Sequence, residues 1–159
     1  MHATLTTTAI TFALVLSTTN AQAPVVETLG PGCGGVGGIP TLDITPLVRV
    51  GQPFQLQVSN LPAPSYCVLE LGLRGDQWGG VQLPFALDQL GMPGCWVYEE
   101  PVLHFHTLTL QGGWTWQVQT PNLPALVGAD MFNQVFFTQP GLNAIQVGTT
   151  NVLHAVITG

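Results

Sequence analysis

The chain has 159 residues, of which only two are Arg and eight are Asp or Glu; none is Lys, and the net charge is −6. Charged residues make up 6% of the chain, against about 25% in an ordinary soluble domain. Affinity for nucleic acids and anionic membranes depends on Lys and Arg. Arg49 and Arg74 cannot supply it, so we expect neither partner. Hydrophobic residues make up 46%, enough to form the core of a single domain.

The first 23 residues have the pattern of a secretory signal peptide. A short apolar run over 9–16 precedes Ala21-Gln22-Ala23, a small-x-small cleavage motif. The run is too short to span a bilayer, which needs about 20 apolar residues. No Lys or Arg precedes it, and Pro24 follows the cleavage motif, so cleavage one or two residues earlier and an apolar N-terminal strand are alternatives. We expect a secreted or cell-surface protein whose mature chain has no membrane span.

Three cysteines, Cys33, Cys67 and Cys95, allow one disulfide and one free thiol. Cys33 and Cys95 each lie in a Gly- and Pro-rich, turn-like segment. Cys67 alternates with Leu69 and Leu71 on a strand face that should be buried. All three pairings are open; we favour Cys33–Cys95, with Cys67 as a small core residue. The sequence has no Cys/His spacing typical of zinc sites.

Alternating apolar and polar residues predict an all-β fold. Residues 54–59 and 114–119 alternate strictly, and residues 85–90 look like a helical turn. Gly, Pro and Asn separate the strands at the short spacing of a sandwich. We predict a single β-sandwich, immunoglobulin-like or jelly-roll-like, of about eight strands over 41–159, preceded by a Gly/Pro-rich segment, 24–40, that a disulfide ties down. Further strands are expected at residues 41–49, 66–73, 95–110, 130–138, 143–148 and 152–158.

Four turn motifs occur together in this chain: GCGGVGGIPTL at 32–42, VGQPF at 50–54, LGMPGC at 90–95 and PALVG at 124–128. With this set, residues 30–159 resemble an uncharacterised secreted β-domain common in planctomycete-type bacteria. The resemblance implies the Cys33–Cys95 disulfide and an extracytoplasmic location, and it implies no catalytic residue. The chain departs from the pattern in having Cys67 and in placing the domain directly after its signal.

His104 and His106 would lie on one face of a strand, a spacing that suits two metal ligands. A third ligand would have to come from His154, Asp130 or Glu99. Residues after the pair, up to Gly113, include no carboxylate. We therefore interpret the two as surface or partly buried strand histidines and predict no metal and no cofactor.

Catalytic groups are scarce. Glu99 and Glu100 are adjacent, so on a strand they would point to opposite faces, whereas a glycosidase needs two carboxyl groups facing each other. Nothing in the sequence selects another pair. The mature chain has only Ser59 and Ser65, neither in a nucleophile elbow. We predict no catalytic residue and a protein that is not an enzyme, with a metal-dependent enzyme as the remaining alternative.

Tryptophans are the best candidates for contact with a ligand or partner. Trp78 lies in a Gly-bounded loop, where exposed aromatic side chains often mark contacts, and it is the residue we favour. Trp96 follows Cys95 and could cover the disulfide. Trp114 and Trp116 share a strand face that either packs in the core or forms a sugar-stacking platform.

Two functions from different classes fit these features. The first is a structural or adhesive module of the cell surface or matrix that can associate with itself or with other surface proteins. Its strands lack the Lys residues that normally guard sheet edges. The second is a carbohydrate-binding β-sandwich that uses Trp78 with neighbouring Asn and Gln. We expect the first.

Overall fold

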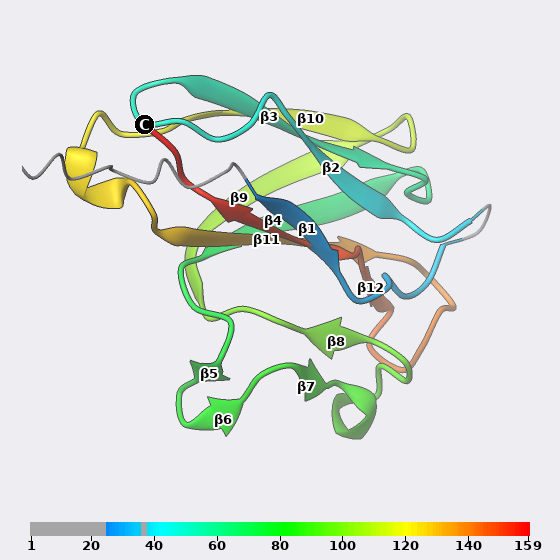
Figure 1. The fold of residues 1–159 in the computed structure, drawn as a ribbon. Helices are drawn as coiled ribbons and strands as arrows, with labels where there is room; N and C mark the ends of the chain where they lie inside the picture. Colours follow the sequence, from blue (N-terminus) through cyan, green and yellow to red (C-terminus); the bar gives the residue numbers. More distant parts are fainter. Residues whose placement is uncertain (1–24, 36–37) are drawn as a thin grey trace, which may run out of the picture.

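The computed structural model describes residues 25–35 and 38–159 and confirms the predicted all-β sandwich. The predicted signal peptide, residues 1–23, lies outside the described residues. Figure 1 shows three layers: a three-stranded sheet, a six-stranded sheet, and a set of short hairpins on the far side of the six-stranded sheet. The third layer is an addition to the two-layer sandwich that the sequence predicts.

The six-stranded sheet is antiparallel and has the order β1-β13-β11-β4-β9, with β12 also paired to β11. Segment 24–40, which we expected to precede the sandwich, in fact provides β1, and β1 pairs with β13 along one edge of this sheet. The strands are β1 (Val26–Leu29), β4 (Ser65–Gly72), β9 (Pro101–Thr109), β11 (Asp130–Thr138), β12 (Val147–Thr149) and β13 (Val152–Val156).

The three-stranded sheet has the order β10-β3-β2, formed by β2 (Thr41–Thr45), β3 (Pro53–Ser59) and β10 (Trp114–Gln119). The predicted alternation is confirmed in β3: Phe54, Leu56 and Val58 are buried, and the residues between them are exposed. This follows from the two-residue period of a strand, which turns successive side chains to opposite faces.

The main core lies between the two sheets. It joins apolar side chains of β2, β3 and β10 to those of β4, β11 and β13. Cys67 and Leu69 are fully buried within it, as the sequence predicts. Cys67 is the free cysteine, and burial raises the pKa of its thiol to about 11.

The third layer, here called the covering segment, comprises residues 73–100 between β4 and β9. It contains two short hairpin pairs and packs a second apolar cluster, with Leu87 and Met92 at its centre, against Phe136 of the six-stranded sheet. The disulfide Cys33–Cys95 ties it to the N-terminal segment. Its elements are β5 (Gln77–Trp78), β6 (Val81–Gln82), β7 (Phe85–Ala86), the 3-10 helix η1 (Asp88–Leu90) and β8 (Trp96–Val97).

Three expected elements differ from the prediction. The strand expected over 95–110 is divided into β8 and β9, because the chain turns at residues 98–100 as it leaves the covering segment. The helical turn expected over 85–90 is reduced to η1. The strand expected over 143–148 begins only at Val147, because the Asn143 side chain closes a turn: its Nδ2 donates to the Val147 carbonyl and its Oδ1 accepts from the Val147 N–H.

A further 3-10 helix, η2 (Pro124–Leu126), connects β10 with β11. Within the part of the chain that the structure describes, no helix has the length and hydrophobicity needed to cross a membrane.

Candidate interaction surface

The sandwich has two open sides that differ in charge. On one side the edge strands are β1 and β2, which carry Glu27 and Asp43. On the other side the edge strands are β9 and β10, which contain no Asp, Glu, Lys or Arg. Residues of β9 and β10 line one groove together, so these two strands border the same opening. We call β9, β10 and this groove the uncharged side.

Strand β9 exposes apolar side chains on both faces of the sheet. Leu103 and Phe105 share the inner face with Leu71 and Leu69 of β4, to which they are paired. Yet Leu103 is 53% exposed and Phe105 38%, while Leu69 is completely buried. On the opposite face Leu108 is 59% exposed. The three-stranded sheet therefore covers β4 but leaves β9 largely uncovered.

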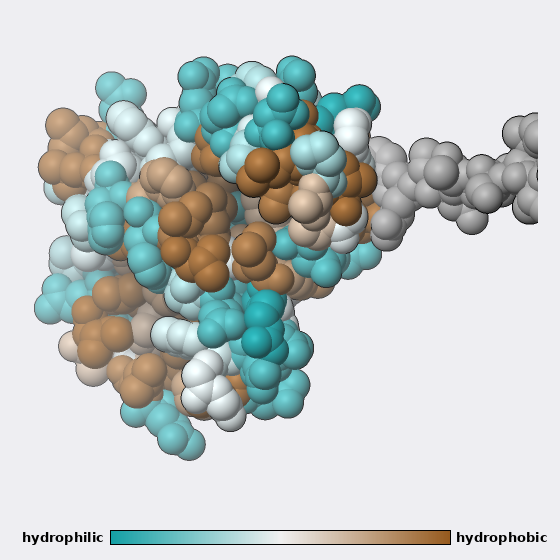
Figure 2. Space-filling model, turned by 90° about the vertical axis from the view of Figure 1, so that its left-hand side faces the viewer, coloured by the Kyte–Doolittle hydropathy of each residue, from teal (hydrophilic) through white to brown (hydrophobic). Residues whose placement is uncertain are grey.

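The groove between the two sheets on this side has a volume of about 440 Å³, and most of its lining is apolar. Val102, Leu103 and Phe105 border it from β9, and Val118 borders it from β10. Figure 2 shows hydrophobic side chains reaching the surface in several patches, with hydrophilic side chains between them. Exposed apolar patches of this kind mark contact sites more often than solitary exposed residues do.

The outer edge of β9 has little protection against pairing with another strand. Proteins usually guard such edges with Lys, Pro, bulges, very short strands or a covering element. Here Pro101 and a register shift between Leu71 and Gly72 protect only the start of the strand. From Leu103 to Thr109 the pairing with β4 is regular, and in the described residues β9 has no neighbour on its other side.

The predicted histidine pair lies on the outer face of β9, where each ring contacts a side chain of β4. His104 Nδ1 lies 3.4 Å from a carboxylate oxygen of Glu70, and His106 Nδ1 lies 2.8 Å from the Tyr66 hydroxyl. Of the expected third ligands, His154 instead pairs with Asp130 in another part of the sheet, at 2.7 Å. Within the described ranges no three His, Cys, Asp or Glu side chains are placed to hold a metal ion.

A buried acidic group lies where the covering segment meets the sheet. Glu99 is fully buried beside Gly72, and neither of its carboxylate oxygens accepts a well-formed hydrogen bond among the described residues. Burial first, and then the charge of Glu70, raise the pKa of Glu99 well above its ordinary value, although the nearby backbone N–H groups of Gly72 and Gln134 oppose the shift. Burial also raises the pKa of Glu70, although His104 opposes this shift. Since Glu99 has no exposed surface, it cannot meet a substrate in this conformation.

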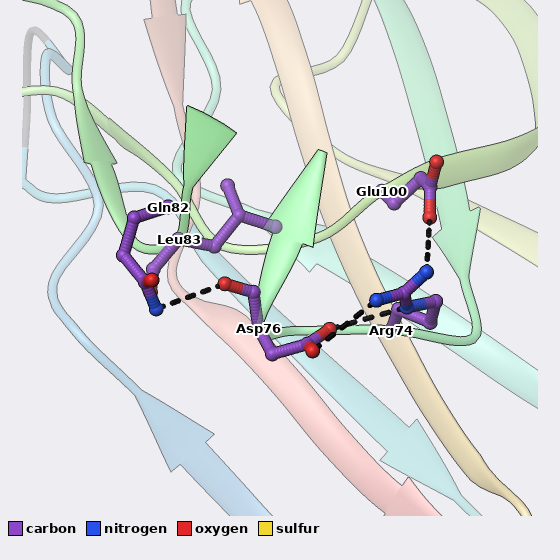
Figure 3. A network of polar contacts seen from close by, with 5 residues as sticks. All are labelled: Arg74, Asp76, Gln82, Leu83 and Glu100. Atoms are coloured by element: carbon purple, nitrogen blue, oxygen red, sulfur yellow. Dashed lines mark hydrogen bonds and ion pairs between the residues drawn. The ribbon is translucent and has the colours of Figure 1, made fainter. Parts of the chain in front are cut away.

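Glu99 and Glu100 lie between β8 and β9 rather than on the strand where the sequence places them; Glu99 is buried and Glu100 is partly exposed. Figure 3 shows Glu100 beside Arg74, whose guanidinium also forms an ion pair with Asp76 at 3.2 Å. Gln82 Nε2 donates to the Asp76 carbonyl. These contacts are exposed and brace the first hairpin of the covering segment, so they point to local structure more than to a binding site.

The four tryptophans have different environments. Trp78 is 46% exposed in the β5–β6 hairpin, and Trp96 is 36% exposed. Trp116 is buried in the main core, so it packs in the core and does not form a sugar-stacking platform. Trp114, on the same face at the start of β10, is 44% exposed.

Sequence reasoning missed two features of this surface. It did not predict that β9 is an exposed edge strand. The run from Val102 to Leu110 has apolar residues at both odd and even positions, so its pattern does not indicate which face is exposed. It also could not bring Glu70 and Glu99 together, since most of the covering segment separates them in the sequence. The absence of charge in β9 was the available signal.

In comparisons with known proteins, no protein-family model and no curated protein matches the chain.

Proposed function

We propose that this protein is a non-enzymatic structural or adhesive module that works outside the cytoplasm and associates with itself through the uncharged side. The observation that carries the proposal is β9: a nine-residue edge strand without charge, with apolar side chains exposed on both faces. Such an edge favours pairing with another strand.

The extracytoplasmic location is supported by the disulfide between Cys33 and Cys95, because disulfides persist mainly in oxidising compartments. The signal-like pattern of residues 1–23 and the resemblance to secreted β-domains of planctomycete-type bacteria support the same location. The cell surface or matrix is the place where a sparsely charged contact module fits best.

A bead assay tests the adhesive function. Beads coated with the purified protein should cluster, and beads coated with Leu108→Lys should not, because the substitution places a charge on the exposed edge strand without disturbing the core. Ile145→Lys is the matched control, since Ile145 is 50% exposed in the turn before β12. Clustering that survives Leu108→Lys, or that Ile145→Lys abolishes equally, would contradict the proposal.

Carbohydrate binding is the second candidate, favoured by one observation: the indole of Trp78 is half exposed on a hairpin. Exposed aromatic rings provide stacking surfaces for ligands. A glycan array should then show binding that Trp78→Ala removes and Trp96→Ala retains. Strong binding with that pattern would favour this candidate over a purely structural module.

A further inference from the structure

We infer that two copies of this chain form a closed dimer by pairing their β9 strands antiparallel about a two-fold axis at Phe105. This inference rests on the proposed self-association and names the surface and register through which it occurs. It joins the two six-stranded sheets into one continuous sheet and leaves both three-stranded sheets on the same side of it.

The charge distribution selects a second copy as the partner. Two copies, each with a net charge of −6, repel one another wherever their carboxylates approach. The uncharged side is the place where they can meet without this cost, because β9 and β10 carry no charged residue. The opposite side cannot extend the assembly in the same way, since β1 and β2 present Glu27 and Asp43. Pairing β9 with its own copy about a two-fold axis makes the contact isologous, so it closes as a dimer instead of propagating into a fibre.

Phe105 is the middle residue of β9, so a two-fold axis there pairs the strand over its full length. With the axis there, Phe105 lies opposite its own copy and Leu103 lies opposite Thr107, all on the inner face. His104 then faces His106. An axis at His104 would place Leu103 opposite Phe105 but leave Leu108 and Thr109 unpaired, and a shift to odd spacing would turn the inner side chains to the outer face. The Phe105 register is the one that uses the whole strand.

The groove supports the same arrangement. Leu103 and Phe105 are exposed because the three-stranded sheet of their own copy does not reach over β9. A second copy with its three-stranded sheet on the same side would bring its own Leu103 and Phe105 against them. The apolar openings of both copies would then meet across the axis and exclude water.

The size of the contact predicts a weak dimer. Nine residues extend about 30 Å at roughly 3.4 Å per residue. Covering a strip of that length and about 15 Å width on both copies buries about 900 Å², just below the roughly 1,000 Å² of a stable specific interface. We therefore expect reversible association at micromolar concentrations.

Engineered cysteines test the register directly. Opposed residues of antiparallel strands have Cα atoms about 4.5–5.5 Å apart, within disulfide range. Phe105→Cys should therefore cross-link to its own copy under mild oxidation. It should do so at least about tenfold faster than Ile145→Cys, because pairing raises the local thiol concentration. The native Cys67 does not compete, since it is buried and its thiol pKa is raised to about 11.

A mixture keeps the test independent of how Phe105→Cys folds. Leu103→Cys mixed with Thr107→Cys, which face each other in the Phe105 register, should give mixed dimers faster than either variant gives dimers alone. Dimers in sedimentation without this cross-linking pattern would overturn the β9 register while leaving self-association intact. A monomer at every concentration, with cross-linking no faster than for Ile145→Cys, would overturn both.

Discussion

Replacing Glu99 with Gln should stabilise the protein at neutral and alkaline pH and remove much of the pH dependence of its stability. Glu99 is fully buried, and neither of its carboxylate oxygens accepts a well-formed hydrogen bond within the described residues. Ionising it in the folded state therefore places a charge in the interior that the nearby backbone N–H groups of Gly72 and Gln134 offset only in part. Glutamine retains the shape of the side chain and cannot ionise.

The direction follows from the raised pKa of Glu99. The folded protein holds a proton that the unfolded chain has already released, so stability is greatest below the unfolded pKa, near 4.5. It falls as the pH rises from there through the folded pKa, by up to about 1.4 kcal/mol per pH unit for one group. Glu70 adds to the same trend, because burial raises its pKa as well.

The magnitude follows from the same linkage, because glutamine stays a buried polar group like the protonated acid and removes only the cost of the raised pKa, up to about 1.4 kcal/mol per pH unit. At pH 8, Glu99→Gln should raise the free energy of unfolding by about 1–3 kcal/mol, and the gain should largely disappear near pH 4.5. Urea unfolding with the disulfide intact, measured at both pH values, provides the comparison. The control is Glu100→Gln, a partly exposed neighbour paired with Arg74, for which the change should be below about 0.5 kcal/mol. A Glu99→Gln protein less stable than the parent at pH 8, or equally shifted at both pH values, would refute this reasoning.

Three further predictions concern the core and the cysteines. Replacing Cys33 and Cys95 with Ala should lower the free energy of unfolding by up to about 4 kcal/mol, because the disulfide closes a loop with a sequence separation of 62. An unchanged midpoint of urea unfolding would contradict this. Leu69→Ala should cost about 2–5 kcal/mol by leaving a cavity in the core, whereas Leu108→Ala should cost less than about 1 kcal/mol; similar losses in urea unfolding would show that β9 is covered as β4 is. The Cys67 thiol should resist a thiol reagent at pH 8 until the chain unfolds, since it is buried with a pKa of about 11; rapid labelling of the folded protein would show that the core is open.

Local periodicity predicted the parts of the fold that depend on one face being buried. Residues 54–59 form β3 as expected because Phe54, Leu56 and Val58 point into one core. Cys67 was predicted as a core residue for the same reason. The Cys33–Cys95 pairing was favoured because both cysteines lie in turns, and the structure contains that bond.

Features that depend on layers packing together were not predictable from local patterns. The covering segment has strands of only two residues, too short for alternation to indicate them, and its place depends on the apolar cluster around Leu87. The burial of Glu99 follows from that placement. The exposure of Leu103 and Phe105 depends on how far the three-stranded sheet extends across β9, which no property of β9 itself encodes.

Sedimentation equilibrium over a concentration series tests the central claim of self-association through the uncharged side most directly. The purified protein should show a reversible equilibrium between monomer and dimer at micromolar concentrations. Leu108→Lys should shift this equilibrium to the monomer, and Ile145→Lys should leave it unchanged. A parent protein that remains monomeric up to about 1 mM, where even very weak specific contacts are populated, would contradict the account.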